Sequence, residues 1–208
     1  TTTTSSPHPP PTPPPTTLPS LVLCSAYMMS LSKWSDNPDV TLNLTMFNRQ
    51  PIHPDVNKVL GDFTNIALLG YYAREDFNFM EIVESMKMQL WNAIEYRSFN
   101  VINLLGRLAE KHGDAVAAPY VFTSLIDSDA EGTEQTMTKI GFEEIFAQTQ
   151  TPQVVLDHQL YVRNGKLLLV LDYVKQAFDN EILDELFADY TSRVKRLADM
   201  EDWSMLYE

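Results

Sequence analysis

The chain has little of what disulfide-rich, metal-binding and membrane proteins depend on. Its 208 residues include a single cysteine, Cys24, which cannot form a disulfide within the chain and has no neighbour at metal-ligand spacing. Because Cys24 lies in an apolar helical pattern, we expect a buried structural thiol rather than a nucleophile. The longest apolar stretch, Leu18 to Leu31, is interrupted by serines and is too short to cross a bilayer. It follows an uncharged segment, which also argues against a signal peptide.

Basic residues are scarce as well. The chain has 15 lysines and arginines against 28 acidic residues, which gives a formal net charge of −13. Nucleic acids and anionic lipids are bound by clustered basic side chains, so neither is an expected partner. The four histidines show no His-x3-His spacing, and no metal site is predicted. The composition therefore predicts a soluble cytoplasmic protein whose like charges keep its molecules apart.

The first seventeen residues differ from the rest of the chain. Residues 1–17 contain only threonine, serine, proline and one histidine. Without aliphatic or aromatic side chains to bury, they cannot offset the entropy lost on ordering, and their prolines favour extended geometry. We therefore expect a disordered Thr/Pro-rich linker over 1–17. The 44% hydrophobic and 11% aromatic content of the chain is that of a globular protein, so 18–208 should form one domain.

Hydrophobic periodicity predicts alternating helices and strands in that domain. A hairpin is expected around Asn164-Gly165, one of the strongest local turn signals, and Gly113 is expected to end a helix. Helices that flank a mainly β middle predict an α/β (α+β) layered fold. Helices are expected over 18–34, 78–96, 100–111 and from an Asn180 N-cap to about 197, with strands over 40–47, 62–69, 120–126, 154–162 and 167–173.

The most informative stretch is the segment 149–159. A polar turn is followed by an apolar run and then directly by Asp157, His158 and Gln159. Aspartate is depleted in strands, so Asp157 is predicted to hold a carboxylate at the end of a β segment, where it suits a site. The alternative is a turn acid that accepts hydrogen bonds from backbone amides.

Three blocks of the sequence resemble the last three core motifs of heterocyclisation domains, the specialised condensation domains of nonribosomal peptide synthetases. In order they read GDFTNIALL (Gly61–Leu69), PYVFTSL (Pro119–Leu125) and QTPQVVLDHQ (Gln150–Gln159). The segments 26–35 and 44–56 are similar to the motifs that precede them. The resemblance covers about Leu18 to Leu197, which is nearly all of the foldable chain.

The resemblance implies a particular fold and a partial domain. Family members consist of two acyltransferase-like lobes, and their hallmark Asp-x4-Asp-x2-Ser motif lies in the first lobe. No such motif precedes the three blocks here. We therefore expect 18–208 to be the C-terminal lobe only, a chloramphenicol-acetyltransferase-like lobe with a mixed β-sheet flanked by helices. The N-terminal lobe and peptidyl or aminoacyl carrier protein domains would be its partners.

The family reaction joins two aminoacyl groups that are held as thioesters on phosphopantetheine arms, and then closes a thiazoline or oxazoline ring with loss of water. No cofactor is bound covalently, because the substrates arrive on the carrier proteins' arms. The matching motifs place a catalytic pair at Thr123 and Asp157. A carboxylate such as Asp157 can move the protons that dehydration requires, and the Thr123 hydroxyl can orient it or the intermediate. Spacing alone favours the alternative, in which Thr123 is a buried strand hydroxyl bonded to a neighbouring carbonyl.

Other motif residues are expected to support this pair. Asn48 and Ser124 would position substrate or intermediate, although local backbone hydrogen bonds would explain them equally well. Asp62 is expected to pair with Arg49 or another cation as a structural bridge. The remaining motif residues with an expected structural role are Thr64, Gln153, His158 and Gln159.

The chain has no glycine-rich phosphate loop, no Gly-x-Ser-x-Gly motif and no serine in a carrier-protein context. It should therefore neither activate amino acids with ATP nor carry a phosphopantetheine itself. A lobe that works as part of a complete enzyme and a truncated, inactive lobe that serves only as an interaction or remnant module both remain open. The isolated half is expected to be inactive, because one wall cannot hold two substrates in a reactive geometry.

Overall fold

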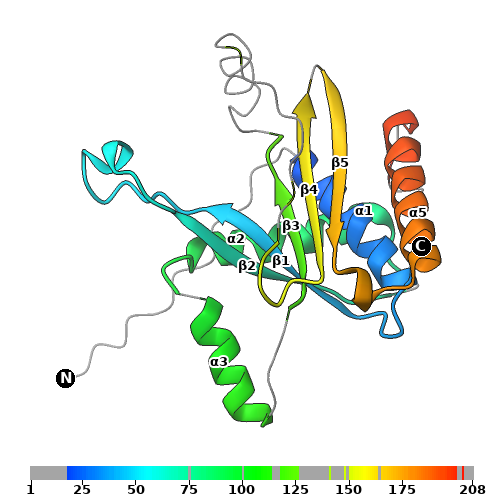
Figure 1. Cartoon of the computed structure of the whole chain (residues 1–208), viewed down its shortest axis with the longest axis horizontal. Helices are drawn as coiled ribbons and strands as arrows, with labels where there is room; N and C mark the ends of the chain where they lie inside the picture. The colour runs from blue at the N-terminus through cyan, green and yellow to red at the C-terminus, as the bar shows by residue number, and fades with distance from the viewer. Residues whose placement is uncertain are drawn as a thin grey trace.

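A five-stranded mixed sheet forms the centre of the chain in the computed structural model (Figure 1). The strand order is β2-β1-β3-β4-β5, with parallel pairs β1–β3 and β3–β4 and antiparallel pairs β1–β2 and β4–β5. The strands are β1 (Val40–Phe47), β2 (Thr64–Tyr71), β3 (Tyr120–Ser124), β4 (Leu156–Arg163) and β5 (Lys166–Tyr173). The structure describes residues 18–74, 76–99, 101–113, 118–126, 141, 148, 150–163, 165–200 and 203. The expected linker 1–17 lies outside these residues.

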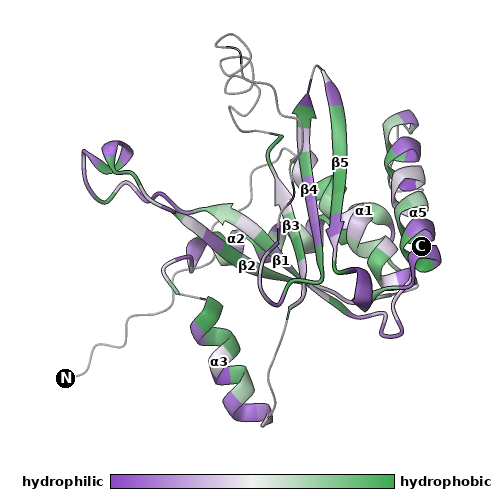
Figure 2. Cartoon of the chain, viewed as in Figure 1, coloured by the Kyte–Doolittle hydropathy of each residue, from purple (hydrophilic) through white to green (hydrophobic). Residues whose placement is uncertain are grey.

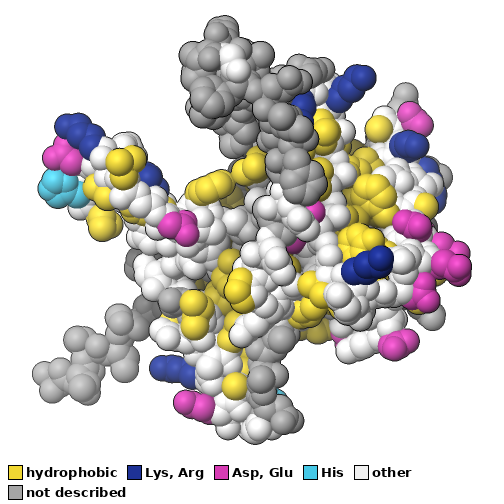
Figure 3. Space-filling model, in the orientation of Figure 1, with side chains coloured by type: hydrophobic (Ala, Val, Ile, Leu, Met, Phe, Trp, Pro, Cys, Tyr) yellow, Lys and Arg dark blue, Asp and Glu magenta, His cyan; other side chains and the backbone are white. Residues whose placement is uncertain are grey.

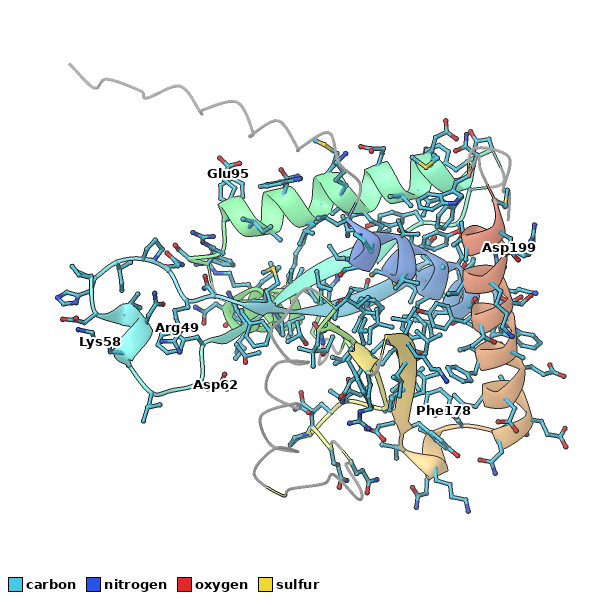
Figure 4. All side chains as sticks on the ribbon, turned by 90° about the horizontal axis from the view of Figure 1, so that it is seen from above. Arg49, Lys58, Asp62, Glu95, Phe178 and Asp199 are labelled. Carbon is cyan, nitrogen blue, oxygen red and sulfur yellow. The ribbon has the colours of Figure 1, made fainter. Side chains whose placement is uncertain are left out.

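Helices cover one face of this sheet (Figure 4). The helices are α1 (Pro19–Lys33), α2 (Phe79–Glu95), α3 (Val101–His112) and α5 (Asn180–Asp199), with short 3-10 turns η1 (Val56–Lys58) and η2 (Lys175–Ala177). Helix α1 packs between α2 and α5 and contacts β1 and β2. All of its residues from Leu21 to Ser32 are buried, which explains why the sequence of α1 is apolar on every side (Figure 2). The predicted α/β architecture is confirmed.

The core lies between the sheet and these helices. Leu44 and Phe122 are paired on adjacent strands and point toward α1, as do Leu156 and Leu160. Because successive strand residues point to opposite faces, the intervening residues Thr45, Thr123, Asp157 and Gln159 lie on the other face. We call the face that α1, α2 and α5 do not cover the open face. Along the strands, buried apolar residues alternate with half-buried polar residues, which is the pattern of a sheet with one covered side.

Helix ends follow local capping chemistry. Asn78 caps α2 with a full capping box, in which its side chain accepts from Glu81 and Glu81 accepts from the Asn78 amide. Helix α5 begins one residue earlier than predicted, because its N-cap is Asp179 and not Asn180. The Asp179 backbone is extended and its carboxylate accepts a hydrogen bond of 2.9 Å from the Glu181 amide. Aspartate and asparagine are both favoured N-cap residues, so the sequence offered two adjacent candidates and the predicted one was wrong.

The β1–β2 ribbon continues beyond the sheet as a projecting arm, residues 48–63 (Figure 4). Arg49 braces the arm by donating to the carbonyls of Val56 (2.6 Å) and Val59 (2.9 Å), and its guanidinium lies 3.7 Å from the Phe63 ring centroid. The expected pairing of Asp62 with Arg49 is wrong. Asp62 instead accepts from the amide of Thr64 at 2.8 Å, and hydrogen bonds from the Thr64 side chain and backbone lower the Asp62 pKa. Figure 3 shows apolar and charged side chains side by side on this arm.

The outer edge of β2 is covered locally by a side chain of α2. The Gln89 amide nitrogen donates to the Gly70 carbonyl, and its oxygen accepts from the Gly70 amide, both at 2.8 Å. A glutamine side chain thereby takes the place of a further strand at this point. Within the described part of the chain, no helix is long and apolar enough to cross a membrane.

Candidate functional site

Thr123 and Asp157 lie on neighbouring parallel strands and on the same side of the sheet. Val121 is paired with Asp157 and Thr123 with Gln159, so the two predicted catalytic residues are offset by two positions. Given a strand spacing near 4.8 Å and a rise near 3.3 Å per residue, their Cα atoms are roughly 8 Å apart. Both side chains are half-buried on the open face. The fold thus brings together, on one surface, two residues that are 34 positions apart in the sequence.

The Thr123 hydroxyl has a defined partner. It donates a hydrogen bond of 2.8 Å to the hydroxyl of Thr45 in β1. The partner is therefore another side chain and not the neighbouring carbonyl that a simple strand threonine would use. Thr45 was not selected from the sequence, although the alternation of residues 40–47 places Thr41, Asn43 and Thr45 on one side of that strand.

Asp157 has one polar neighbour on its own strand and one on the adjacent strand β5. The Gln159 amide donates to Asp157 Oδ2 at 3.4 Å, a long hydrogen bond between two residues of one strand face. Across the β4–β5 hairpin, Asp172 is the residue directly opposite Asp157. The site thus has a second carboxylate, which sequence reasoning missed. The hairpin register about Asn164-Gly165 could have identified it.

His158 points to the opposite side of the sheet from Asp157 and is fully buried. Its Nδ1 lies 2.9 Å from the Val170 carbonyl and its Nε2 lies 3.1 Å from the Tyr190 hydroxyl. Burial lowers the His158 pKa to about 4, so the ring is neutral at pH 7. A carbonyl can only accept, so Nδ1 carries the proton, and Nε2 accepts from Tyr190. The ring also packs against Tyr27 and Phe122.

These contacts of His158 have a consequence for Asp157. Adjacent strand residues point in opposite directions, so a ring held on the helix side directs the neighbouring carboxylate to the open face. His158 reaches α5 through Tyr190 and β5 through Val170. It has the geometry of an anchor for β4, with no exposed atom through which it could meet a substrate.

The two residues expected to bind substrate contact other parts of the chain. Ser124 is on the helix side of β3, where its hydroxyl lies 2.8 Å from that of Ser20 at the start of α1. Asn48 follows the end of β1, and its amide donates to the Arg97 carbonyl at 3.4 Å. Asn48 and Thr64 line an open pocket of about 510 Å³ at the base of the arm. The other residues lining this pocket are Gln50, Ile52, Val56, Phe63, Asn65, Arg97 and Ser98.

The turn that leads into β4 contains a residue in an uncommon backbone conformation. Gln153 has a φ of 68°, in the left-handed region that few residues other than glycine adopt. The Val154 amide donates to the Thr151 carbonyl at 3.1 Å, which closes the turn. The Val155 amide then donates to the Pro119 carbonyl at 2.9 Å. This turn fixes the start of β4 against the start of β3, and so it sets the level of Asp157 along the sheet.

The Asp-x4-Asp-x2-Ser spacing does occur once in the chain, after the three motif blocks, at Asp184, Asp189 and Ser192. All three lie in α5, on the opposite side of the sheet from Thr123. Burial alone would raise the Asp189 pKa, but hydrogen bonds from Lys33, Arg193 and Ser30 outweigh it and lower that pKa to about 2. The carboxylate holds α5 against α1, so the match is a structural feature of a helix.

Two further groups bear on the predictions. Cys24 is fully buried, and burial raises its pKa to about 12, which agrees with an inert thiol. Among the described residues, no group of three or more His, Cys, Asp or Glu side chains could hold a metal ion. The polar side chains described above on the open face carry hydroxyl, amide and carboxylate groups.

Comparison with known proteins defines the class to which this fold and surface belong. The family model for the condensation domain matches residues 15–201, so the chain belongs to the condensation domain family. It is 34% identical over 192 residues to bacitracin synthase 1 of Bacillus licheniformis, covering 90% of this chain and 4% of that protein. It is 31% identical over 180 residues to phenyloxazoline synthase MbtB of Mycobacterium sp. (strain MCS), covering 86% of this chain and 15% of that protein.

A solved structure shares the fold. The cyclization-docking bidomain of the nonribosomal peptide synthetase EpoB from Sorangium cellulosum superposes with a TM-score of 0.75 and 34% sequence identity. The match covers 89% of this chain and 37% of that one. The chain therefore spans only a small part of the length of these relatives. The predicted chloramphenicol-acetyltransferase-like lobe, a mixed sheet flanked by helices, agrees with this comparison.

Proposed function

We propose that residues 18–208 form the C-terminal lobe of a heterocyclisation domain in a nonribosomal peptide synthetase, preceded by a linker over 1–17. Two aminoacyl groups would arrive as thioesters on the phosphopantetheine arms of carrier protein domains and be joined by a peptide bond. A cysteine, serine or threonine side chain would then close a thiazoline or oxazoline ring. Similarity to a phenyloxazoline synthase and to a cyclization bidomain supports this subtype within the condensation domain family.

The observation that carries the proposal is the placement of Thr123 and Asp157 on one open face, on adjacent strands of fixed register. Ring closure begins when the side-chain nucleophile adds to the amide carbonyl and gives a cyclic adduct with an N–H and a C–OH group. In the dehydration that follows, the C–O bond breaks as a C=N bond forms, the nitrogen loses one proton and the departing hydroxyl gains one. A carboxylate that accepts the first proton and returns it to the hydroxyl ends unchanged.

Asp157 is the group proposed for this proton transfer, and Thr123 is proposed to hydrogen-bond the adduct beside it. The Gln159 amide, on the same face of β4, donates to Asp157 Oδ2. His158, anchored beneath the sheet, sets the direction of the Asp157 side chain. Ser124 lies on the helix side of β3, so a direct role for it at the ring-closing step requires the substrate to extend beyond the Thr123–Asp157 surface. Asn48, which follows the end of β1, remains a proposed substrate-binding residue.

The test uses a complete condensation domain that carries this lobe, with loaded carrier proteins. Asp157→Asn should lower ring formation by about 100-fold or more, the usual range for loss of a general acid–base group, while the linear dipeptide accumulates. Mass spectrometry separates the two products by one water. Asp184→Asn, which removes an exposed acid of α5, is the matched control and should change neither product. Equal loss of linear and cyclic products in Asp157→Asn would contradict the proton-transfer role.

A further inference from the structure

Thr45 stands out among the residues that the proposed chemistry does not yet use. It lies in β1, the strand beside β3, and it is half-buried on the open face. The strand register pairs Asn43 with Val121 and Leu44 with Phe122, and one further step along these parallel strands brings Thr45 beside Thr123. The two hydroxyl oxygens are 2.8 Å apart, with Thr123 as the donor.

The direction of this hydrogen bond limits what Thr123 can do. A hydroxyl has one proton to donate and two lone pairs that accept. Since the Thr123 proton is directed to Thr45, its oxygen can offer a third group only its lone pairs. Threonine is β-branched and stiff about its first side-chain torsion, so the same bond selects one rotamer on each strand.

We propose that Thr45 is a positioning residue for Thr123. By accepting the Thr123 proton, Thr45 fixes the Thr123 oxygen as a hydrogen-bond acceptor that faces the reacting peptide. Thr123 thus receives a hydrogen bond from an N–H or O–H group of the cyclic adduct. This inference rests on the proposed function, since it assigns Thr45 a part in the same ring-closing site.

If Thr45 had only a structural role, a different effect of Thr45→Val would be expected. Across β1, Thr45 is opposite Ile66 of β2, and a valine of equal shape would pack there at least as well. A structural threonine would therefore tolerate Thr45→Val with little change in either stability or product ratio. A positioning threonine requires the oxygen, which serine also supplies.

The experiment compares Thr45→Val, Thr45→Ser and Thr41→Val in a complete condensation domain that carries this lobe. Thr41 is the matched control, because it lies on the same face of the same strand, exposed and opposite Gly70. Thr45→Val should lower the ratio of cyclic to linear product by about threefold to tenfold, which is the range for loss of one hydrogen bond. Thr45→Ser should retain most of the ratio, and Thr41→Val should leave it unchanged.

The outcomes separate the inference from the proposed function. If wild-type and Thr41→Val domains form rings and Thr45→Val does so at the same ratio, the positioning role of Thr45 is wrong. If the wild-type domain forms linear peptide but no ring, the proposed function itself fails. A crystal structure of the Thr45→Val chain gives a readout independent of activity. It should show the Thr123 hydroxyl turned from its present position, and an unmoved Thr123 would count against the inference.

Discussion

Asp157 is directly opposite Asp172 across the β4–β5 hairpin, on the open face of the sheet. In an antiparallel pair, Cβ atoms of directly opposed residues are about 4.5–5.5 Å apart. Like charges in this arrangement oppose folding, because the unfolded chain lets them separate. The register therefore gives the proposed catalytic acid a directly opposed carboxylate as its cross-strand neighbour.

The first prediction concerns this pair of carboxylates. In a double-mutant cycle of Asp157→Asn and Asp172→Asn at pH 7, the coupling energy between the two carboxylates should be unfavourable by about 0.2–1 kcal/mol, since either change removes the same repulsion. Urea denaturation of the four proteins gives the coupling energy of the pair. Strictly additive effects would show that the two carboxylates do not interact.

A second prediction addresses the anchor beneath the site. Tyr190→Phe removes the donor to His158 Nε2 and leaves a buried ring nitrogen without its hydrogen bond. The free energy of unfolding should fall by about 1–3 kcal/mol. Tyr96→Phe, which changes a tyrosine that is 66% exposed, should alter stability very little. Similar losses in both variants would mean that the His158–Tyr190 contact contributes nothing specific.

The pH dependence of stability follows from the same histidine. Burial lowers the His158 pKa from 6.5 to about 4 in the folded state, so the unfolded chain binds more protons between these values. Stability is therefore fully present above about pH 6.5 and falls as the pH is lowered toward 4, by about 3 kcal/mol in total. Denaturation midpoints at pH 7, 5.5 and 4 measure this slope. His158→Gln should flatten it, and an unchanged slope in that variant would assign it to other groups.

The fourth prediction concerns the chain by itself. The purified 208-residue chain should form neither a peptide bond nor a ring when mixed with loaded carrier proteins. The open face offers one wall of a site, and effective catalysis requires both substrates to be held in a reactive geometry. The double variant Thr123→Val and Asp157→Asn serves as the blank. Heterocycle formation above this blank would show that the chain alone is sufficient for the reaction.

Local pattern predicted most elements of the fold. The strand β1 was expected over 40–47 and extends from Val40 to Phe47, because its alternation of side chains is unbroken. The strand β2 begins at Thr64, two residues later than predicted, because the Asp62 side chain turns the backbone by accepting from the Thr64 amide. Hydrogen bonds of this kind compete with strand pairing and are not visible in hydrophobicity.

The site was only partly predictable. The motifs led to Thr123 and Asp157, but Thr45 and Asp172 take part through pairing with distant strands. Their relation to the site depends on the order β2-β1-β3-β4-β5, which no local pattern specifies. Ser124 was grouped with the pair because their motifs are shared, whereas strand alternation places Ser124 on the other face of the sheet.

Gln89 has a consequence for how molecules of this protein can associate. An uncovered strand edge is a template on which a second chain can add its own strand, and such addition leads to fibrous aggregates. At Gly70 both backbone groups are already occupied by the Gln89 amide. Two copies therefore cannot join β2 to β2 through this residue into one continuous ribbon.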